Sequence, residues 1–243
     1  KTVVKKVNGE FPVVATGSFG NTAQEKADFT KKIADTGVDA VIMITSHFAE
    51  KGESDAVVIK NLEEYLSLTG DIPLGTYECP TPYKRILSQK VLKFLLDSDR
   101  LVYHKDTSED IDNIKEKLKT AKGTKMGFYN AHMGSAVASL RNGGAGLSPI
   151  AGNYYPEVIA WICDNAGDSG KKEQVDWLQD KVRDMERRIT ANYMLSSRYY
   201  LNKEGLGLEI VSRRAKNPLT SDQQTVVDKC YAEVQGWKQK LSI

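Results

Sequence analysis

Short apolar runs alternate with amphipathic stretches along the first two thirds of the chain, and this alternation limits the fold more than any other feature. Such runs are typical of the buried strands of a parallel sheet. The stretches between them have the spacing of amphipathic helices. Six βα units in succession predict a parallel sheet with helices packed outside it. The expected strands cover residues 11–16, 40–45, 72–77, 101–104, 125–129 and 146–150.

Helix-start signals lie where this alternation requires them. Thr22 and Ser54 each precede an amphipathic stretch and are candidate N-caps, and Gly37 is the expected stop of the first helix. Thr107 has Asp110 three residues further on, a spacing that resembles a capping box. We therefore expect a helix to begin directly after Thr107.

The strand pattern ends near residue 167. A long helical stretch follows, broken somewhere before Gly205, and a last helix begins after a cap at Thr220 or Ser221. We predict (β/α) barrel units over residues 1–167 and a helical region over residues 168–243 that packs on them. The pattern alone fits both an open doubly wound sheet and part of an eight-stranded barrel.

Composition excludes several classes of protein. The 243 residues include 34 Lys and Arg against 32 Asp and Glu, so neither nucleic acid nor an anionic membrane is an expected partner. No apolar run is long enough to span a bilayer, and no signal peptide is visible. Cys79, Cys163 and Cys230 are odd in number and widely spaced. We expect reduced thiols, a cytoplasmic protein, and neither a disulfide framework nor a zinc site.

One lysine lies in an unusual position. Lys105 comes at the end of the expected strand in "LVYHKDTSED", where parallel sheets and barrels carry reactive groups. Burial there favours the neutral amine, which can attack a carbonyl carbon and form a Schiff base. Tyr77, in "GTYECP" at the end of the preceding strand, could carry the protons. The alternative is a lysine that turns outward and pairs with Asp106 or Glu109.

Other polar side chains follow the remaining strands. They are candidate contacts for a polyhydroxylated or acidic substrate, and the alternative for each is a rim residue that faces water. The candidates are Thr45, His47, Asn130, His132 and Ser148.

"GTYECP", followed about 25 residues later by "LVYHKDTSED", resembles the dihydrodipicolinate synthase / N-acetylneuraminate lyase family of class I aldolases. Tyr77 and Pro80 match its Tyr-x-x-Pro motif, and Lys105 matches its imine-forming lysine. "RNGGAGLSPIAGN" resembles its Gly-rich eighth strand. The resemblance implies a TIM (β/α)8 barrel with units three to eight visible here, followed by a C-terminal helical extension. The first two units have no counterpart, so we expect an incomplete chain.

The resemblance also implies an activity. Pyruvate or a related 2-oxo acid would form a Schiff base with Lys105, Tyr77 would move protons, and an aldehyde would be the second substrate. No cofactor and no metal are expected. The family implies a homotetramer built as a dimer of dimers, and the stretches "SHF" and "TPY" are candidate contacts between subunits.

Two departures from the family bear on the substrate. Pro82 stands where dihydrodipicolinate synthases carry a carboxylate-binding Arg, and His47 and Phe48 stand where the family carries a relay Tyr. Both changes favour a 2-keto-3-deoxy sugar acid over aspartate semialdehyde. Dihydrodipicolinate synthase proper, a 2-keto-3-deoxy acid dehydratase and a non-catalytic 2-oxo acid binder remain alternatives. An unrelated doubly wound binding protein ranks last, because "GSFGNTAQ" lacks the Lys-Ser/Thr of a nucleotide loop.

Overall fold

The structure is a computed structural model that describes residues 1–189, 192–215 and 217–243. It divides into two compact units. The first unit contains Lys1–Tyr129 and Asn142–Ala145, and the second contains Asn130–Arg141 and Gly146–Ile243. The expected division after residue 167 stays a prediction about domains.

A parallel sheet forms the centre of the first unit. The register joins Val14 to Ala40 and Val41 to Leu74, so each strand lies beside the next one in sequence. This order confirms the parallel sheet predicted from the alternation. The strands are β1 (Val14–Thr16), β2 (Ala40–Ile44), β3 (Leu74–Tyr77), β4 (Leu101–Asp106) and β5 (Gly127–Asn130).

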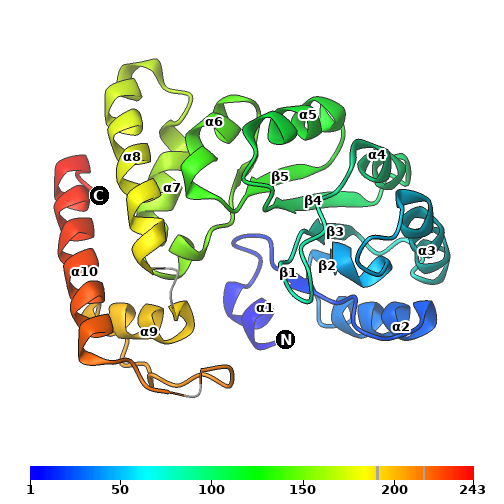
Figure 1. Cartoon of the computed structure of the whole chain (residues 1–243), viewed down its shortest axis with the longest axis horizontal. Helices are drawn as coiled ribbons and strands as arrows, with labels where there is room; N and C mark the ends of the chain where they lie inside the picture. Colours follow the sequence, from blue (N-terminus) through cyan, green and yellow to red (C-terminus); the bar gives the residue numbers. More distant parts are fainter. Residues whose placement is uncertain (190–191, 216) are drawn as a thin grey trace. The chain divides into compact units, whose positions relative to one another are not determined.

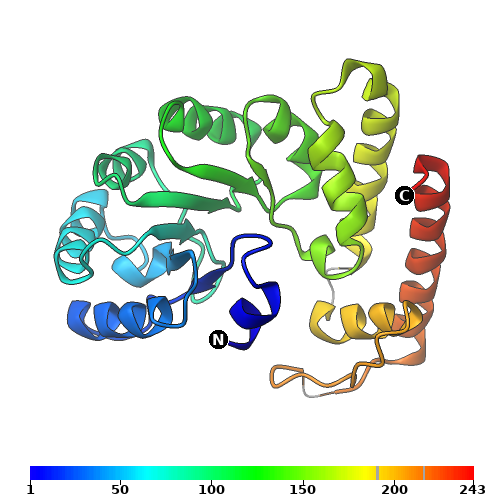
Figure 2. The ribbon, with the colours of Figure 1, turned by 180° about the vertical axis from the view of Figure 1, so that it is seen from behind.

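Figures 1 and 2 show α2 to α5 along one side of these strands. Apolar faces of the helices cover the sheet, because Leu62, Leu92 and Ile114 pack with Val41 and Phe128 in one buried cluster. The helices of this unit are α1 (Thr2–Val7), α2 (Ala23–Ala34), the 3-10 turn η1 (Thr45–Phe48), α3 (Asp55–Leu68), α4 (Gln89–Asp97) and α5 (Ile111–Ala121).

The caps account for the helix starts. Thr22 forms a capping box with Glu25, as its spacing predicts. The start predicted after Thr107 is wrong, because the side chain of Asp110 caps α5. The hydroxyl of Thr107 instead donates to the carbonyl of Glu78 over 2.6 Å.

Some elements differ from the sequence pattern. Strand β4 continues through Lys105 to Asp106, two residues beyond the expected end, while β1 begins only at Val14. Helix α4 was not predicted, although Ser88 caps it in the usual manner.

The second unit is mostly helical, and its core is rich in aromatic side chains, among them Tyr154, Tyr155, Tyr200 and Trp237. The predicted break in the long helix is confirmed, since α8 and α9 are separate helices; residues 190–191 lie outside the described chain. Within the described ranges, no helix meets the length and apolarity that crossing a bilayer requires. The elements are η2 (Met133–Ser135), α6 (Ala136–Arg141), β6 (Gly146–Leu147), η3 (Ile150–Asn153), α7 (Pro156–Asn165), η4 (Ser169–Lys171), α8 (Lys172–Ile189), α9 (Tyr193–Lys203) and α10 (Ser221–Leu241).

Candidate active site

The ends of β3 and β4 bring the two main candidate residues together. Tyr77 and Lys105 are register partners in the parallel ladder, so their side chains leave the same face of the sheet. The ammonium nitrogen of Lys105 lies 4.5 Å from the centre of the Tyr77 ring. Both residues are half-buried. A carbonyl compound at Lys105 would therefore have a phenol beside it.

The surroundings of Lys105 shift it toward the neutral form that a nucleophilic amine needs. Burial lowers the pKa of Lys105, and the nearby Cys79 opposes this shift. In the part of the chain that the structure describes, Lys105 forms no salt bridge. Asp106 binds Lys117 and Glu109 binds Lys84, so both carboxylates that could have neutralised Lys105 have other partners.

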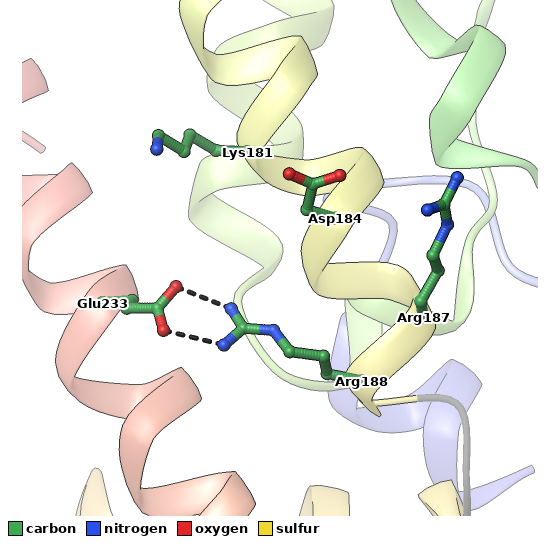
Figure 3. A pocket seen from close by; sticks show the side chains of 5 residues that line it. All are labelled: Lys181, Asp184, Arg187, Arg188 and Glu233. Atoms are coloured by element: carbon green, nitrogen blue, oxygen red, sulfur yellow. Dashed lines mark hydrogen bonds and ion pairs between the residues drawn. The ribbon is translucent and has the colours of Figure 1, made fainter.

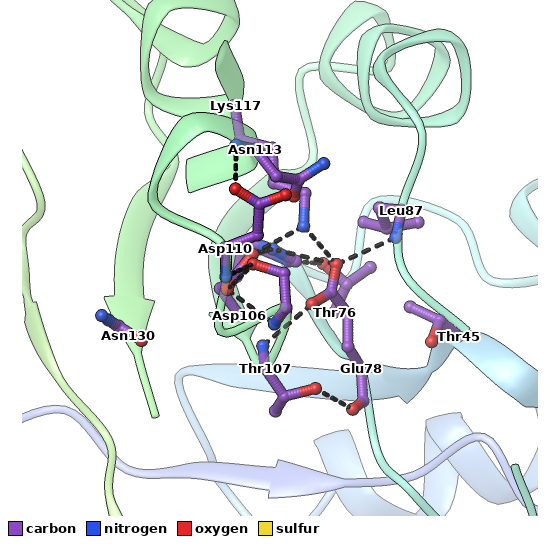
Figure 4. A network of polar contacts seen from close by, with 12 residues as sticks. Thr45, Thr76, Glu78, Leu87, Asp106, Thr107, Asp110, Asn113, Lys117 and Asn130 are labelled. Carbon is purple, nitrogen blue, oxygen red and sulfur yellow. Dashed lines mark hydrogen bonds and ion pairs between the residues drawn. The ribbon is translucent and has the colours of Figure 1, made fainter. Parts of the chain in front are cut away.

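A buried polar cluster occupies the opposite face of the same two strands. Glu78 follows Tyr77, Asp106 follows Lys105, and Lys117 reaches both carboxylates from α5 (Figure 4). These three side chains are fully buried. Burial alone would raise the pKa of Asp106, but its contact with His104 and the charge of Lys117 outweigh burial and hold that pKa below its usual range.

This cluster has the donors of a metal site, but its cation position is filled. Ligand atoms of Glu78, His104 and Asp106 lie within 4.8 Å of one another. The Lys117 ammonium contacts Oε1 of Glu78 and lies 2.6 Å from Oδ2 of Asp106. A metal would have to displace that ammonium, so the donor set fits a lysine better than an ion.

The sequence interpretation missed this cluster, although a signal was present. Alternation along a strand sends Glu78 and Asp106 away from Tyr77 and Lys105, into the layer between sheet and helices. Lys117 stands on the same helical face as Ile114 and Ala121, at spacings of three and four residues. A lysine at such a core position requires a buried partner.

Two further candidates from the first unit are bound to other groups. The hydroxyl of Thr45 donates to the carbonyl of Arg85 over 2.7 Å, and Thr45 is buried. Nδ1 of His47 donates to the carbonyl of Ser18 over 2.6 Å. The rings of Phe19 and His47 pack in an edge-to-face arrangement, with their centroids 5.3 Å apart. These contacts give both side chains a structural task in the fold.

The remaining candidates lie in the second unit. Asn130 is fully buried: its amide donates to Ser135, and its side-chain oxygen accepts the N–H of His132. His132 is half-buried, with Nε2 3.8 Å from a carboxylate oxygen of Glu186. Ser148 donates its backbone N–H to the carbonyl of Asn130. Asn130 therefore holds the turn after β5, whereas His132 and Ser148 keep partly exposed side chains.

Comparison with known proteins decides the family. The sequence profile of the Dihydrodipicolinate synthetase family matches residues 1–234. The chain belongs to this family. The 4-hydroxy-tetrahydrodipicolinate synthase of Clostridium novyi (strain NT) is 27% identical over 167 residues, 68% of this chain and 54% of that enzyme. The enzyme of the same name from Saccharophagus degradans is 26% identical over 85% of this chain and 69% of its own length.

Solved structures share the family fold. YagE, a prophage protein of E. coli K12 determined in complex with pyruvate, superposes with a TM-score of 0.79 at 19% identity; the match covers 96% of this chain and 78% of YagE. The 4-hydroxy-tetrahydrodipicolinate synthase of Methylacidiphilum fumariolicum SolV gives a TM-score of 0.81 at 15% identity and covers 98% and 78%. At these identities the likeness establishes the fold, a parallel α/β half-barrel with helices.

Within this family member, the two cations after Pro82 are engaged with backbone groups. The Arg85 guanidinium donates to the carbonyls of Glu50 and Glu53. Lys84 donates to the carbonyl of Thr107 over 2.9 Å and pairs with Glu109. Arg85 therefore stabilises the loop that contains Glu50 and Glu53. Lys84 lies beside the segment that follows Lys105.

A separate hollow of about 440 Å³ lies on the second unit of this family member, between α8 and α10 (Figure 3). The described residues that line it are all charged, and Arg188 binds both carboxylate oxygens of Glu233, over 2.8 and 2.6 Å. Among the described lining residues, Arg188 is already paired with Glu233, so the contacts of this hollow differ from those of the unpaired Lys105.

Proposed function

We propose that this protein is a Schiff-base-forming class I aldolase or lyase that acts on pyruvate or a related 2-oxo acid. One observation carries the proposal: Lys105, with its pKa lowered by burial and without a carboxylate partner in the described residues, lies 4.5 Å from the Tyr77 ring centre. Membership of the Dihydrodipicolinate synthetase family supports it, and so do relatives named as 4-hydroxy-tetrahydrodipicolinate synthases.

The reaction begins at the neutral amine of Lys105. Its nitrogen adds to C2 of the 2-oxo acid, and the carbinolamine then loses its oxygen as water to leave a protonated imine. The imine takes up electrons when a proton leaves C3, which gives an enamine. In condensation the enamine carbon C3 attacks the aldehyde carbonyl and forms a carbon–carbon bond. In cleavage that bond breaks, the aldehyde leaves, and the enamine stays on Lys105 until C3 is protonated and water hydrolyses the imine to release the 2-oxo acid. The Tyr77 hydroxyl donates and accepts the protons of these steps, because a phenol can do both.

The proposed substrate is a 2-keto-3-deoxy sugar acid or a hydroxylated aldehyde rather than aspartate semialdehyde. Pro82 cannot bind a carboxylate, and Arg85 is engaged with the loop at Glu50 and Glu53. Hydroxyl groups need neutral hydrogen-bonding partners and no cation. Dihydrodipicolinate synthase proper is the second candidate. The names of the relatives favour it, and so does Lys84, a cation bound to the carbonyl of Thr107 that we propose as a substitute for the Arg.

The assembly belongs to the same proposal. We infer an eight-unit (β/α) barrel with a C-terminal helical extension, in a cytoplasmic homotetramer built as a dimer of dimers. The family membership supports this architecture, and sedimentation of the full-length protein at micromolar concentration tests the tetramer. No metal or cofactor takes part in the proposed chemistry.

Exchange of the methyl protons of pyruvate for solvent deuterium tests the function without knowledge of the aldehyde. Enamine formation removes a C3 proton, so the methyl signal of pyruvate should fade in proton NMR spectra when the protein is added in D2O. A methyl signal that persists at the rate of the protein-free sample would contradict the proposed function. A coupled assay then compares a 2-keto-3-deoxy sugar acid with pyruvate plus aspartate semialdehyde.

A further inference from the structure

The strand pair that presents Tyr77 and Lys105 has a second face that the proposed reaction does not use. Thr76 and His104 are register partners on that face, and Oγ1 of Thr76 lies 2.9 Å from Nδ1 of His104. The residues that follow the two reactive side chains, Glu78 and Asp106, leave the same face. Each reactive residue is thus the chain neighbour of a buried carboxylate.

Lys117 joins these two carboxylates across the strands. It comes from α5, and its ammonium contacts Oε1 of Glu78 and lies 2.6 Å from Oδ2 of Asp106 (Figure 4). The three side chains have no solvent exposure. A single cation therefore ties the residue after Tyr77 to the residue after Lys105.

Glu78 extends this tie into both loops that leave the strands. Its carboxylate accepts the N–H of Leu87 over 2.9 Å and the N–H of Thr107 over 2.9 Å. The Thr107 hydroxyl donates back to the carbonyl of Glu78, and the N–H of Glu78 donates to the carbonyl of Lys105. The backbone around both reactive residues is held by one carboxylate.

Asp106 does the same on the other strand. Its second oxygen, Oδ1, accepts the N–H and the hydroxyl of Ser108 over 2.9 and 2.7 Å. The two carboxylates therefore have a hydrogen bond or ion pair at each of their four oxygens, counting Lys117 on one oxygen of each. Such complete pairing is what a buried ionic group needs to be tolerated.

We propose that Lys117, Glu78 and Asp106 form a positioning clamp that fixes the Tyr77 hydroxyl relative to the Lys105 nitrogen. This inference rests on the proposed function and names the residues that make its proton transfers efficient. Lys117 touches neither substrate nor reacting atoms, so it is a positioning residue. A displacement of about 1 Å between reacting groups can lower a rate about a hundredfold.

The stability of the fold does not by itself explain why Lys117, Glu78 and Asp106 are buried together. A buried ion pair usually stabilises a fold no better than apolar side chains of similar volume, because desolvation offsets the attraction. The neighbouring core of this unit is apolar, with Ile114 and Leu118 on the same face of α5. The charged triad lies on the opposite face of the strands that carry Tyr77 and Lys105. Its role as a clamp, which fixes the positions of these two residues, explains why charged side chains occupy this part of the core.

The test is a double-mutant cycle on the exchange of pyruvate methyl protons, measured in the full-length protein. Lys117→Met and Asp106→Asn are made in the wild-type background and in the Tyr77→Phe background. Asp106→Asn keeps the Oδ1 acceptor for Ser108 and replaces the oxygen that faces Lys117 and His104 with an uncharged amide nitrogen. Lys119→Met, at an exposed position of the same helix, is the matched control.

The clamp predicts that Lys117→Met lowers kcat for exchange about ten- to a hundredfold, with KM for pyruvate changed less than about threefold, because the binding groups remain. In the Tyr77→Phe background the same change should lower the rate less than about threefold, since the hydroxyl that the clamp positions is gone. Asp106→Asn should follow the same pattern with a smaller effect. The Lys119→Met variant should exchange the methyl protons of pyruvate at the wild-type rate.

Other outcomes show whether the clamp or the proposed function is wrong. Should Lys117→Met fail to fold, Asp106→Asn carries the cycle. Folded variants that exchange at the wild-type rate, or that lose as much activity in the Tyr77→Phe background as in the wild type, contradict the clamp alone. A wild-type protein that exchanges no protons contradicts the proposed function, and the role of the clamp falls with it.

Discussion

Two lysines occupy opposite faces of the β3–β4 strand pair and are in opposite states. Lys105 is half-buried beside the Tyr77 ring and has no salt bridge in the described residues. Lys117 is fully buried and bound to two carboxylates. Burial without a counter-charge lowers the pKa of Lys105 toward a usable nucleophile. Lys117, between two carboxylates, is instead held in ion pairs. The face of the sheet on which a lysine lies therefore determines whether it can act as a nucleophile or serves as a structural ion-pair partner.

The largest expected effect comes from the loss of the unpaired lysine. Lys105→Met should reduce the exchange of pyruvate protons to the protein-free rate, because the proposed imine-forming amine is removed. The free energy of unfolding should stay the same or rise at pH 7, since a poorly solvated charge is removed. Proton NMR and urea titration measure the two quantities. Exchange that survives in Lys105→Met would place the nucleophile elsewhere.

The partner on the same face is Tyr77. Tyr77→Phe keeps the ring against Lys105 and removes the hydroxyl, so the exchange rate should fall about a hundred- to ten-thousandfold, the usual effect of losing a general acid or base. The urea midpoint should change little. An exchange rate near that of the wild type would mean that water or another side chain carries the protons.

A substitution on the opposite face should change the free energy of unfolding. Lys117→Met leaves Glu78 and Asp106 buried without their cation, which should lower the free energy of unfolding by about 3–5 kcal/mol. Lys84→Met, which removes an exposed pair with Glu109, is the control and should cost about 0–1 kcal/mol. Urea unfolding followed by circular dichroism distinguishes them. Equal losses in the two variants would contradict the contrast between buried and exposed lysines.

The smallest effect is a pH dependence of stability. The folded chain binds the Lys105 proton less tightly than the unfolded chain does, because burial lowers its pKa. The unfolded state therefore binds more protons, and stability from this group rises with pH from the lowered pKa up to about 10.4. The wild type should gain stability relative to Lys105→Met as pH rises through this window. A constant difference between the two unfolding free energies would contradict the lowered pKa.

Much of the fold could be predicted from local pattern. The short apolar runs identified the parallel strands, and Thr22 with Glu25 marked a helix start through a capping box that the structure contains. The Tyr77 and Lys105 pair followed from their places at the ends of successive strands, which the register brings together. These predictions depend on contacts between near neighbours or between adjacent strands.

The missed features depend on contacts that local pattern does not encode. Thr107 looked like a cap, but its hydroxyl bonds to Glu78, 29 residues away in sequence. Lys117 looked like one of many helical lysines, and its two carboxylate partners come from separate strands. Thr45 and His47 lie at a strand end as predicted, yet tertiary hydrogen bonds to Arg85 and Ser18 occupy them. Whether they or the candidates of the second unit bind substrate stays a prediction.

Borohydride trapping with pyruvate, followed by peptide mapping, tests the central claim that Lys105 is the imine-forming nucleophile. Reduction should attach one three-carbon unit to the full-length protein, and mapping should find it on the peptide that contains Lys105, with Lys117 unmodified. Lys105→Met should acquire no adduct under the same conditions. An adduct on another lysine, or no adduct with pyruvate or any other 2-oxo acid, would contradict the account.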